Sequence, residues 1–136
     1  MVRSEITVRL DCPAEQVWET VTDLSRQGWR SDVERVEITG EASFVEYGKG
    51  GFATAFTVTE REPPRRWAFD LENKNIQGRW TGDFTDAAGG CTVTFTEEIT
   101  VKKAWMRAFA GLYVKRQQRQ YLADLKKALG PGVSKN

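Results

Sequence analysis

The sequence contains no histidine among its 136 residues. Histidine is the usual general base at neutral pH and a frequent metal ligand, so proton transfer here must depend on carboxylates, tyrosine, lysine or arginine. Cysteine is scarce too: the two thiols, Cys12 and Cys91, lie far apart in the sequence and fit no zinc motif. We therefore expect no metal site, and free thiols rather than a disulfide.

Cofactor motifs are also missing. Residues 48–51, Gly-Lys-Gly-Gly, lack the spacing of a phosphate-binding loop and are typical of a turn. No serine lies in the G-x-S-x-G pattern of hydrolase nucleophiles. These absences predict that the chain binds no cofactor, and they argue against hydride or phosphoryl transfer.

Long apolar runs are absent as well. No run approaches the length of a membrane span, and the first ten residues, MVRSEITVRL, lack the apolar core of a secretion signal. We therefore expect a cytoplasmic protein with no integral membrane segment. The length fits one domain, and Gly130-Pro131-Gly132 predicts where its last helix stops. This places the domain in residues 1–130 and a disordered tail in residues 131–136.

What the chain has in quantity is alternation of apolar and polar residues. Ile6, Val8 and Leu10 alternate with polar residues, which predicts a first strand. Pro13 then favours the start of a short helix, and we expect a second short helix or turn in residues 23–32. Strand after strand is predicted beyond Val33, in segments around residues 36–38, 44–47, 52–60, 67–71, 80–84 and 93–101.

Residues 103–129 form a long segment without proline, and Leu122, Leu125 and Leu129 fall at helical spacing within it. Strands joined by hairpins form an antiparallel sheet, and one long helix must cover its apolar face. The predicted fold class is therefore α+β. We expect a curved antiparallel sheet of about six or seven strands wrapped around a long C-terminal helix, with two short helices after the first strand.

Charge is distributed unevenly along the chain. Residues 1–101 contain 18 acids and 11 bases, whereas residues 102–129 contain eight bases and Asp124 as their one acid. The favoured interpretation is a solvated outer helix face, and the alternative is an anionic partner such as a membrane surface or nucleic acid. Basic patches with interleaved aromatic residues do not appear in the strands, so we expect no nucleic-acid partner.

Several segments carry a resemblance to a known superfamily. They are ITVRLDCPAEQVW from Ile6, the stretch around Trp29, EREPPRRW in residues 60–67, GGCTVTF in residues 89–95 and LADLK in residues 122–126. Over residues 3–129 the chain resembles the START-like, polyketide-cyclase and lipid-transport superfamily (SRPBCC), which includes the birch pollen allergen. The resemblance implies a helix-grip fold. Because members include cyclases as well as sterol and hormone binders, it does not select one function.

Eight aromatic side chains are candidates for lining a cavity between sheet and helix: Trp29, Phe56, Trp67, Phe69, Trp80, Phe95, Phe109 and Tyr113. Trp67 and Phe69 share one strand face, so their rings and those of neighbouring strands should form one wall. The alternative is that these rings are ordinary core residues that leave no space for a ligand.

Glu97 is the one candidate for acid–base catalysis. It has the same strand parity as Val93 and Phe95, which points it toward the apolar side of the sheet. A carboxyl group in such a place has a raised pKa, which suits proton transfer. The alternative is that Glu97 lies in solvent or pairs with a helix base such as Arg107.

Three functions fit this sequence, and it leaves open whether the protein is an enzyme. The preferred function is binding of a small apolar or aromatic molecule in a cavity between sheet and C-terminal helix. The second is a cofactor-independent polyketide cyclase or dehydratase, favoured if two or more polar side chains converge in the cavity. The third is a protein-interaction module, favoured by a filled core and an exposed apolar patch. A homodimer is a further alternative.

Overall fold

The computed structural model describes residues 1–130, so the tail predicted for residues 131–136 lies outside the described residues. The elements follow one another as β1 (Val2–Leu10), α1 (Ala14–Thr22), β2 (Arg35–Gly40), β3 (Ser43–Tyr47), η1 (Lys49–Gly51), β4 (Ala53–Glu62), β5 (Arg66–Glu72), β6 (Ile76–Ala87), β7 (Gly90–Val101), η2 (Ala104–Ala108) and α2 (Ala110–Leu129).

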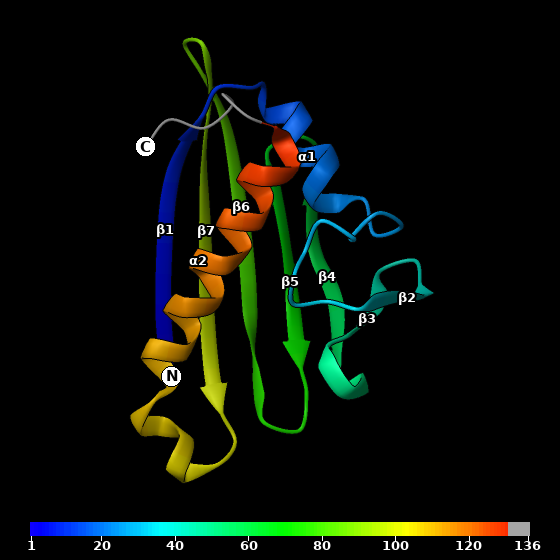
Figure 1. Ribbon diagram of the computed structural model, residues 1–136, viewed down its shortest axis with the longest axis vertical. Coiled ribbons are helices and arrows are strands. Elements are labelled where there is room, and N and C mark those ends of the chain that lie inside the picture. The colour runs from blue at the N-terminus through cyan, green and yellow to red at the C-terminus, as the bar shows by residue number, and fades with distance from the viewer. Residues whose placement is uncertain (131–136) are drawn as a thin grey trace.

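The strands of residues 1–130 form one seven-stranded antiparallel sheet in the order β1-β7-β6-β5-β4-β3-β2. Figure 1 shows the sheet curving around α2, which crosses its concave face, while α1 lies near the C-terminal end of α2. The α+β class and the helix-grip architecture expected from the sequence are confirmed.

A buried polar contact holds α2 against the first strand. Gln118 donates from Nε2 to the carbonyl oxygens of Ser4 and Phe95, at 2.9 and 3.3 Å, and accepts a bond from Ser4 Oγ at 2.7 Å. Leu122, Leu125 and the rest of the apolar stripe of α2 are buried against the sheet. The helix is thus positioned by apolar burial and fixed in register by one amide group.

The sheet register brings large rings together on the concave face. Phe69 pairs with Trp80 across β5 and β6, and Trp80 pairs with Glu97 across β6 and β7. Gly82 leaves room for this packing, because a Cβ atom there would lie 2.8 Å from the Trp80 ring. Phe69 and Trp80 therefore point to the concave face of the sheet, as the alternation of residues in the sequence predicted.

The second short helix expected after β1 is not formed. Residues 23–34 make turns, and their polar side chains bond to nearby backbone. Asp23 Oδ1 accepts the backbone N–H of Ser25, and Gln27 Nε2 donates to the Asp23 carbonyl oxygen at 2.8 Å. Local side-chain bonds of this kind compete with helical hydrogen bonding, which explains why α1 is not followed by another helix.

The long C-terminal helix also begins later than predicted. Residues 104–108 form the 3₁₀ turn η2, and α2 starts at Ala110. Phe109, at the junction, has φ −113° and ψ −4°, which interrupts helical geometry. The interruption separates η2 from α2, and η2 contributes no fully buried residue.

Cys12 and Cys91 are both buried free thiols. Burial raises the pKa of Cys91 to about 11.

In the described part of the chain no helix is long and apolar enough to cross a membrane.

Candidate functional site

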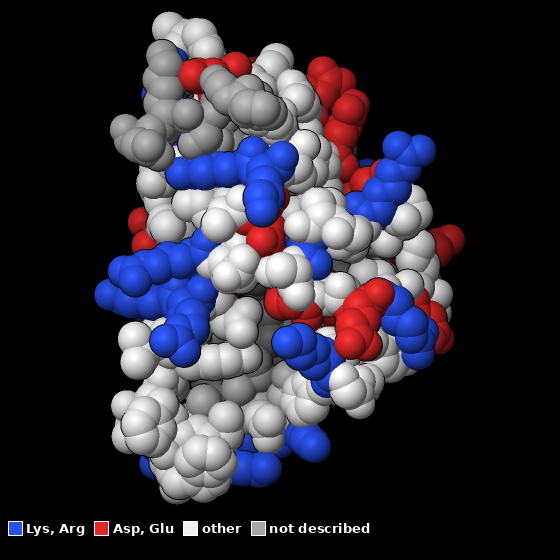
Figure 2. All heavy atoms as spheres, viewed as in Figure 1, with Lys and Arg blue, Asp and Glu red and all other residues white. Residues whose placement is uncertain are grey.

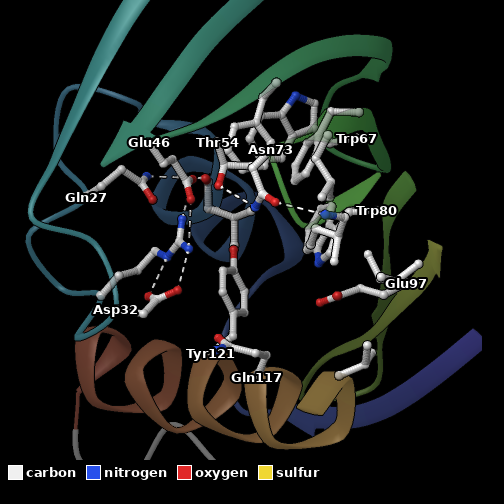
Figure 3. Close-up of a pocket in the computed structure, with 18 of the residues that line it drawn as sticks. Gln27, Asp32, Glu46, Thr54, Trp67, Asn73, Trp80, Glu97, Gln117 and Tyr121 are labelled. Carbon is white, nitrogen blue, oxygen red and sulfur yellow. Dashed lines mark hydrogen bonds and ion pairs between the residues drawn. The ribbon is translucent and has the colours of Figure 1, made fainter. Parts of the chain in front are cut away.

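A cavity of about 160 Å³ lies between the concave face of the sheet and α2. Its wall is formed by strands β3 to β7, by the segment after α1 and by α2, so residues distant in the sequence meet there. Figure 3 shows Tyr121 and Gln117 approaching from α2, and Glu97 from β7, while Trp67 and Trp80 lie on the sheet side. The cavity is therefore bounded by both layers of the fold.

Aromatic rings from the sheet form one side of this cavity. They are Phe56, Trp67, Phe69 and Trp80, all of which the sequence predicted. Phe69 and Trp80 are stacked with ring centroids 4.9 Å apart, and Trp67 meets Phe69 edge to face at 5.1 Å. Each ring supports its neighbour, so the wall is fixed in shape before a ligand binds.

Two predicted lining residues belong to the core instead. Phe95 is only 1% exposed and is covered by Trp80 and Tyr121, with ring centroids at 5.1 and 5.4 Å. Trp29 packs edge-on against the Tyr121 ring at 5.3 Å and is absent from the cavity wall. Strand parity predicted the direction of Phe95 correctly, but both rings pack against Tyr121, and Tyr121 rather than either of them lines the cavity.

Phe109 also lies outside the cavity, because the break before α2 turns it toward solvent. It is 63% exposed and lines a second hollow together with Trp105 and Tyr113. Tyr113, one turn further along α2, lines both hollows, so its predicted place in the cavity wall agrees with the structure.

The cavity has a polar side that sequence reasoning missed. Arg30 binds two carboxylates there: Nη1 lies 2.6 Å from Glu46 Oε2, and Nη2 lies 3.0 Å from Asp32 Oδ2. The Arg30 and Glu46 side chains are largely buried. Glu46 has the same strand parity as the buried Phe44, and that signal could have revealed it. Arg30 and Asp32 lie in irregular chain, where no periodicity exists to reveal them.

The segment that carries Arg30 is tied to the helix by Asp124. Its Oδ2 accepts the backbone N–H and the hydroxyl of Ser31, each at 2.8 Å. Although burial opposes ionisation, these two bonds and a third from Gln120 lower the pKa of Asp124. Asp124, the one acid in α2, therefore holds in place the loop that positions Arg30 at the cavity.

Glu97 enters the cavity from β7, as its parity predicted, and does not pair with Arg107. Burial raises the pKa of Glu97 to about 7; the positive charge of Arg30 opposes this rise and the negative charge of Asp32 adds to it. No hydrogen bond contributes to the shift. Glu97 is partly accessible because it borders the cavity, yet protein surrounds it on most sides, so the carboxyl exchanges its proton near neutral pH.

Two tyrosines complete the polar side. Burial raises the pKa of both Tyr113 and Tyr121, and the charge of Glu97 adds to the rise in each case. Burial also opposes the charge of Arg30, but Glu46 and Asp32 outweigh it and raise the pKa of Arg30. At neutral pH the cavity therefore contains neutral tyrosine hydroxyls and a guanidinium already matched by two carboxylates.

The net charge of this polar side limits what it can accept. Arg30 carries one positive charge against Glu46 and Asp32, and ionised Glu97 would add another negative charge. The groups can thus exchange a proton and donate hydrogen bonds, but they repel an anion. Within residues 1–130, no three His, Cys, Asp or Glu side chains group in a way that could hold a metal ion.

Comparison with known proteins gives a family match over nearly the whole chain. A family described as polyketide cyclase / dehydrase and lipid transport matches residues 1–130. No curated protein matches the sequence.

Solved structures share the fold at low sequence identity. A START superfamily protein from Mycobacterium smegmatis aligns with a TM-score of 0.83 and 10% identity, over 93% of this chain and 95% of that one. A conserved protein from Geobacillus kaustophilus aligns with a TM-score of 0.81 and 17% identity, over 93% and 94%. The ZhuI aromatase/cyclase from Streptomyces sp. R1128 aligns with a TM-score of 0.77 and 17% identity, over 91% and 90%. At these identities the likeness concerns the fold.

Proposed function

This chain belongs to the polyketide cyclase / dehydrase and lipid transport family, and from that premise we propose that its cavity binds a small neutral molecule about the size of one aromatic ring. The observation that carries the proposal is the cavity of about 160 Å³ between an aromatic wall and a polar side. An apolar protein cavity of about 150 Å³ is large enough for benzene. A long polyketide chain exceeds this space.

The polar side selects a neutral ligand over an anionic one. The carboxylates of Glu46 and Asp32 already outnumber the charge of Arg30, so a ligand carboxylate would be buried beside excess negative charge. The hydroxyls of Tyr113 and Tyr121 and protonated Glu97 instead offer hydrogen bonds to a neutral oxygen. We therefore assign the ligand class as aryl alcohols, phenols or aryl ketones rather than free acids.

The test is a calorimetric titration with benzyl alcohol and benzoate, which have nearly the same shape and differ in charge. We expect benzyl alcohol to bind with sub-millimolar affinity, or roughly −4 kcal/mol or better. Benzoate should bind at least about tenfold more weakly, which corresponds to about 1.4 kcal/mol. Equal or tighter binding of benzoate would show that the polar side does not select charge.

A cavity-filling variant locates the binding. Val114→Phe adds a ring from α2 to the cavity wall and should abolish binding of benzyl alcohol. Ala123→Phe adds the same ring on the exposed face of α2 and should leave binding unchanged. Binding that survives Val114→Phe in a folded protein would place the ligand elsewhere and overturn the proposal.

The convergence of polar groups supports a second candidate, a cofactor-independent enzyme for proton transfer next to a carbonyl group. Ionised Glu97 would remove the proton from carbon, and a neutral tyrosine hydroxyl would donate a hydrogen bond to the developing enolate oxygen. The name of one structural relative, an aromatase/cyclase, accords with chemistry of this kind.

Hydrogen–deuterium exchange separates binding from catalysis. An enzyme should accelerate exchange of the methyl protons of acetophenone in D₂O, as followed by proton NMR. Glu97→Gln should abolish this acceleration while acetophenone still binds. Exchange no faster than in buffer would remove the catalytic candidate and leave the binding function in place.

A further inference from the structure

Large apolar side chains are exposed where η2 joins α2. Trp105 is 70% exposed, Phe109 is 63% exposed and Leu112 is 66% exposed. We refer to these three residues as the apolar tip. Figure 2 shows uncharged side chains gathered at the end of the molecule that carries η2 in Figure 1. Exposed apolar clusters on a folded protein commonly mark a surface that contacts a partner.

The apolar tip borders a hollow that adjoins the ligand cavity. This hollow, of about 300 Å³, is lined by Trp105, Met106 and Phe109. It shares several wall residues with the cavity: Asn73, Ile76, Ile99, Tyr113 and Val114. A partner that contacts the apolar tip would therefore lie against the mouth of the cavity.

Bases flank the apolar tip, and the stretch of sequence that carries them contains no acid. Residues 102–123 contain no Asp or Glu, and their bases are Lys102, Lys103, Arg107, Lys115, Arg116 and Arg119. All six are exposed, and Lys102 is the one among them that forms an ion pair within residues 1–130, with Glu72. Leu112, Arg116 and Arg119 recur at helical spacing, so one residue of the apolar tip shares the outer face of α2 with two of the bases. The surface combines unpaired positive charge with exposed rings.

We propose that the apolar tip and its flanking bases dock on the surface of an anionic lipid bilayer. Tryptophan favours the boundary between lipid headgroups and acyl chains, where Trp105 would insert, and the apolar ring of Phe109 would be buried beside it. Bases near the surface add attraction to anionic lipids. The proposal depends on this outer surface alone and is independent of what the cavity binds.

Charge also distinguishes this partner from the alternatives. A symmetric dimer through the same face would bring the bases of one copy against those of the other, without acids to match them. A nucleic acid would satisfy the bases, but it gives no role to an exposed aliphatic side chain such as Leu112. A bilayer with anionic headgroups meets both the charge and the apolar side chains.

The first test is flotation with vesicles. Vesicles of phosphatidylcholine with about one third phosphatidylserine should carry the wild-type protein upward, and pure phosphatidylcholine vesicles should not. Binding should fall as salt is raised, because the attraction between bases and headgroups is screened. Equal binding to both vesicle types would contradict the electrostatic part of the proposal.

Matched variants test the two parts of the surface separately. Arg116→Glu with Arg119→Glu should weaken partitioning at least about 25-fold, or about fivefold for each base. The control, Arg26→Glu with Arg65→Glu, reverses two exposed bases elsewhere and should change little. Leu112→Ser should weaken partitioning more than Ile38→Ser, which removes a similarly exposed apolar residue on β2.

Trp105 itself reports insertion. Bromine-labelled lipids should quench tryptophan fluorescence of the bound protein, and Trp105→Phe should remove this quenching while the protein still floats. Unchanged flotation of the Arg116/Arg119 variant, or quenching that persists without Trp105, would overturn the proposal. Self-association that Leu112→Ser abolishes would assign the surface to a second copy, and vesicle-free binding of an oligonucleotide would assign it to nucleic acid.

Discussion

At the scale of single residues, the chemistry of the cavity depends most on Glu97. Its carboxyl group is buried beside both Arg30 and Asp32, and burial raises its pKa to about 7 from an ordinary value of 4.5. The folded protein therefore binds this proton more tightly than the unfolded chain. The resulting stabilisation is complete below pH 4.5 and is lost as the pH rises through about 7.

Glu97→Gln should remove this pH dependence. Relative to the wild type, the variant should gain stability between about pH 4.5 and 7, because glutamine has no proton to lose. Each pKa unit corresponds to about 1.4 kcal/mol, so the relative gain should reach a few kcal/mol. Urea unfolding of both proteins across this pH range measures the difference.

Glu98→Gln is the matched control for that measurement. It removes the neighbouring carboxyl group, which points to the opposite face of β7, and should leave the pH dependence as it is in the wild type. If the stability difference between wild type and Glu97→Gln is the same at every pH, Glu97 is not buried as described.

Strand parity alone was enough to predict one half of the cavity wall. Phe56, Trp67, Phe69, Trp80 and Glu97 lie where alternation places them. Strand parity could not distinguish the inward rings that line the cavity from those that another ring covers. That distinction depends on how the side chains of the sheet and of α2 pack on one another. The other half, around Arg30, lies in chain without periodicity, and only the folded loop brings its charges together.

At the scale of elements, the position of α2 depends on one buried amide as well as on apolar burial. Gln118→Met keeps the size of the side chain but removes three hydrogen bonds to Ser4 and Phe95. The groups left unpaired should lower the free energy of unfolding by about 1–3 kcal/mol. Gln16→Met, on the exposed face of α1, is the control and should cost less than about 0.5 kcal/mol.

Asp124 plays the corresponding role for the loop after α1. Asp124→Asn weakens the bonds to Ser31, so the loop that carries Arg30 should exchange its amide hydrogens faster than in the wild type. Because the folded state lowers the pKa of Asp124, its stabilisation is present above the ordinary value of 3.8 and is lost as the pH falls below it. Loop exchange unaltered by the substitution would mean that other contacts hold the segment.

The pattern of elements was largely predictable because strands, turns and the amphipathic helix each have a period or a stop signal. The exceptions have local causes. Side-chain bonds from Asp23 and Gln27 replace the helix expected after α1, and the break at Phe109 shortens the last helix. Neither cause produces a repeating pattern, so periodicity could not indicate it.

At the scale of the whole molecule, a curved sheet covered by one helix leaves a cavity that neither layer has alone. The aromatic wall belongs to the sheet, while Tyr113 and Tyr121 belong to α2. Ligand binding should therefore stabilise the packing of α2 on the sheet. The outer face of the same helix carries Leu112, Arg116 and Arg119 and continues into the rest of the apolar tip at η2, so the two faces of α2 have separate proposed partners.

The most direct test of the central claim is a two-dimensional NMR titration with benzyl alcohol, using the indole N–H signals of the five tryptophans. Trp67 and Trp80 line the cavity, whereas Trp18 lies in the core and Trp105 in the apolar tip. We expect saturable shifts of the Trp67 and Trp80 signals, with those of Trp18 and Trp105 unchanged. Shifts confined to Trp105, or no saturable shift at any tryptophan, would contradict that claim.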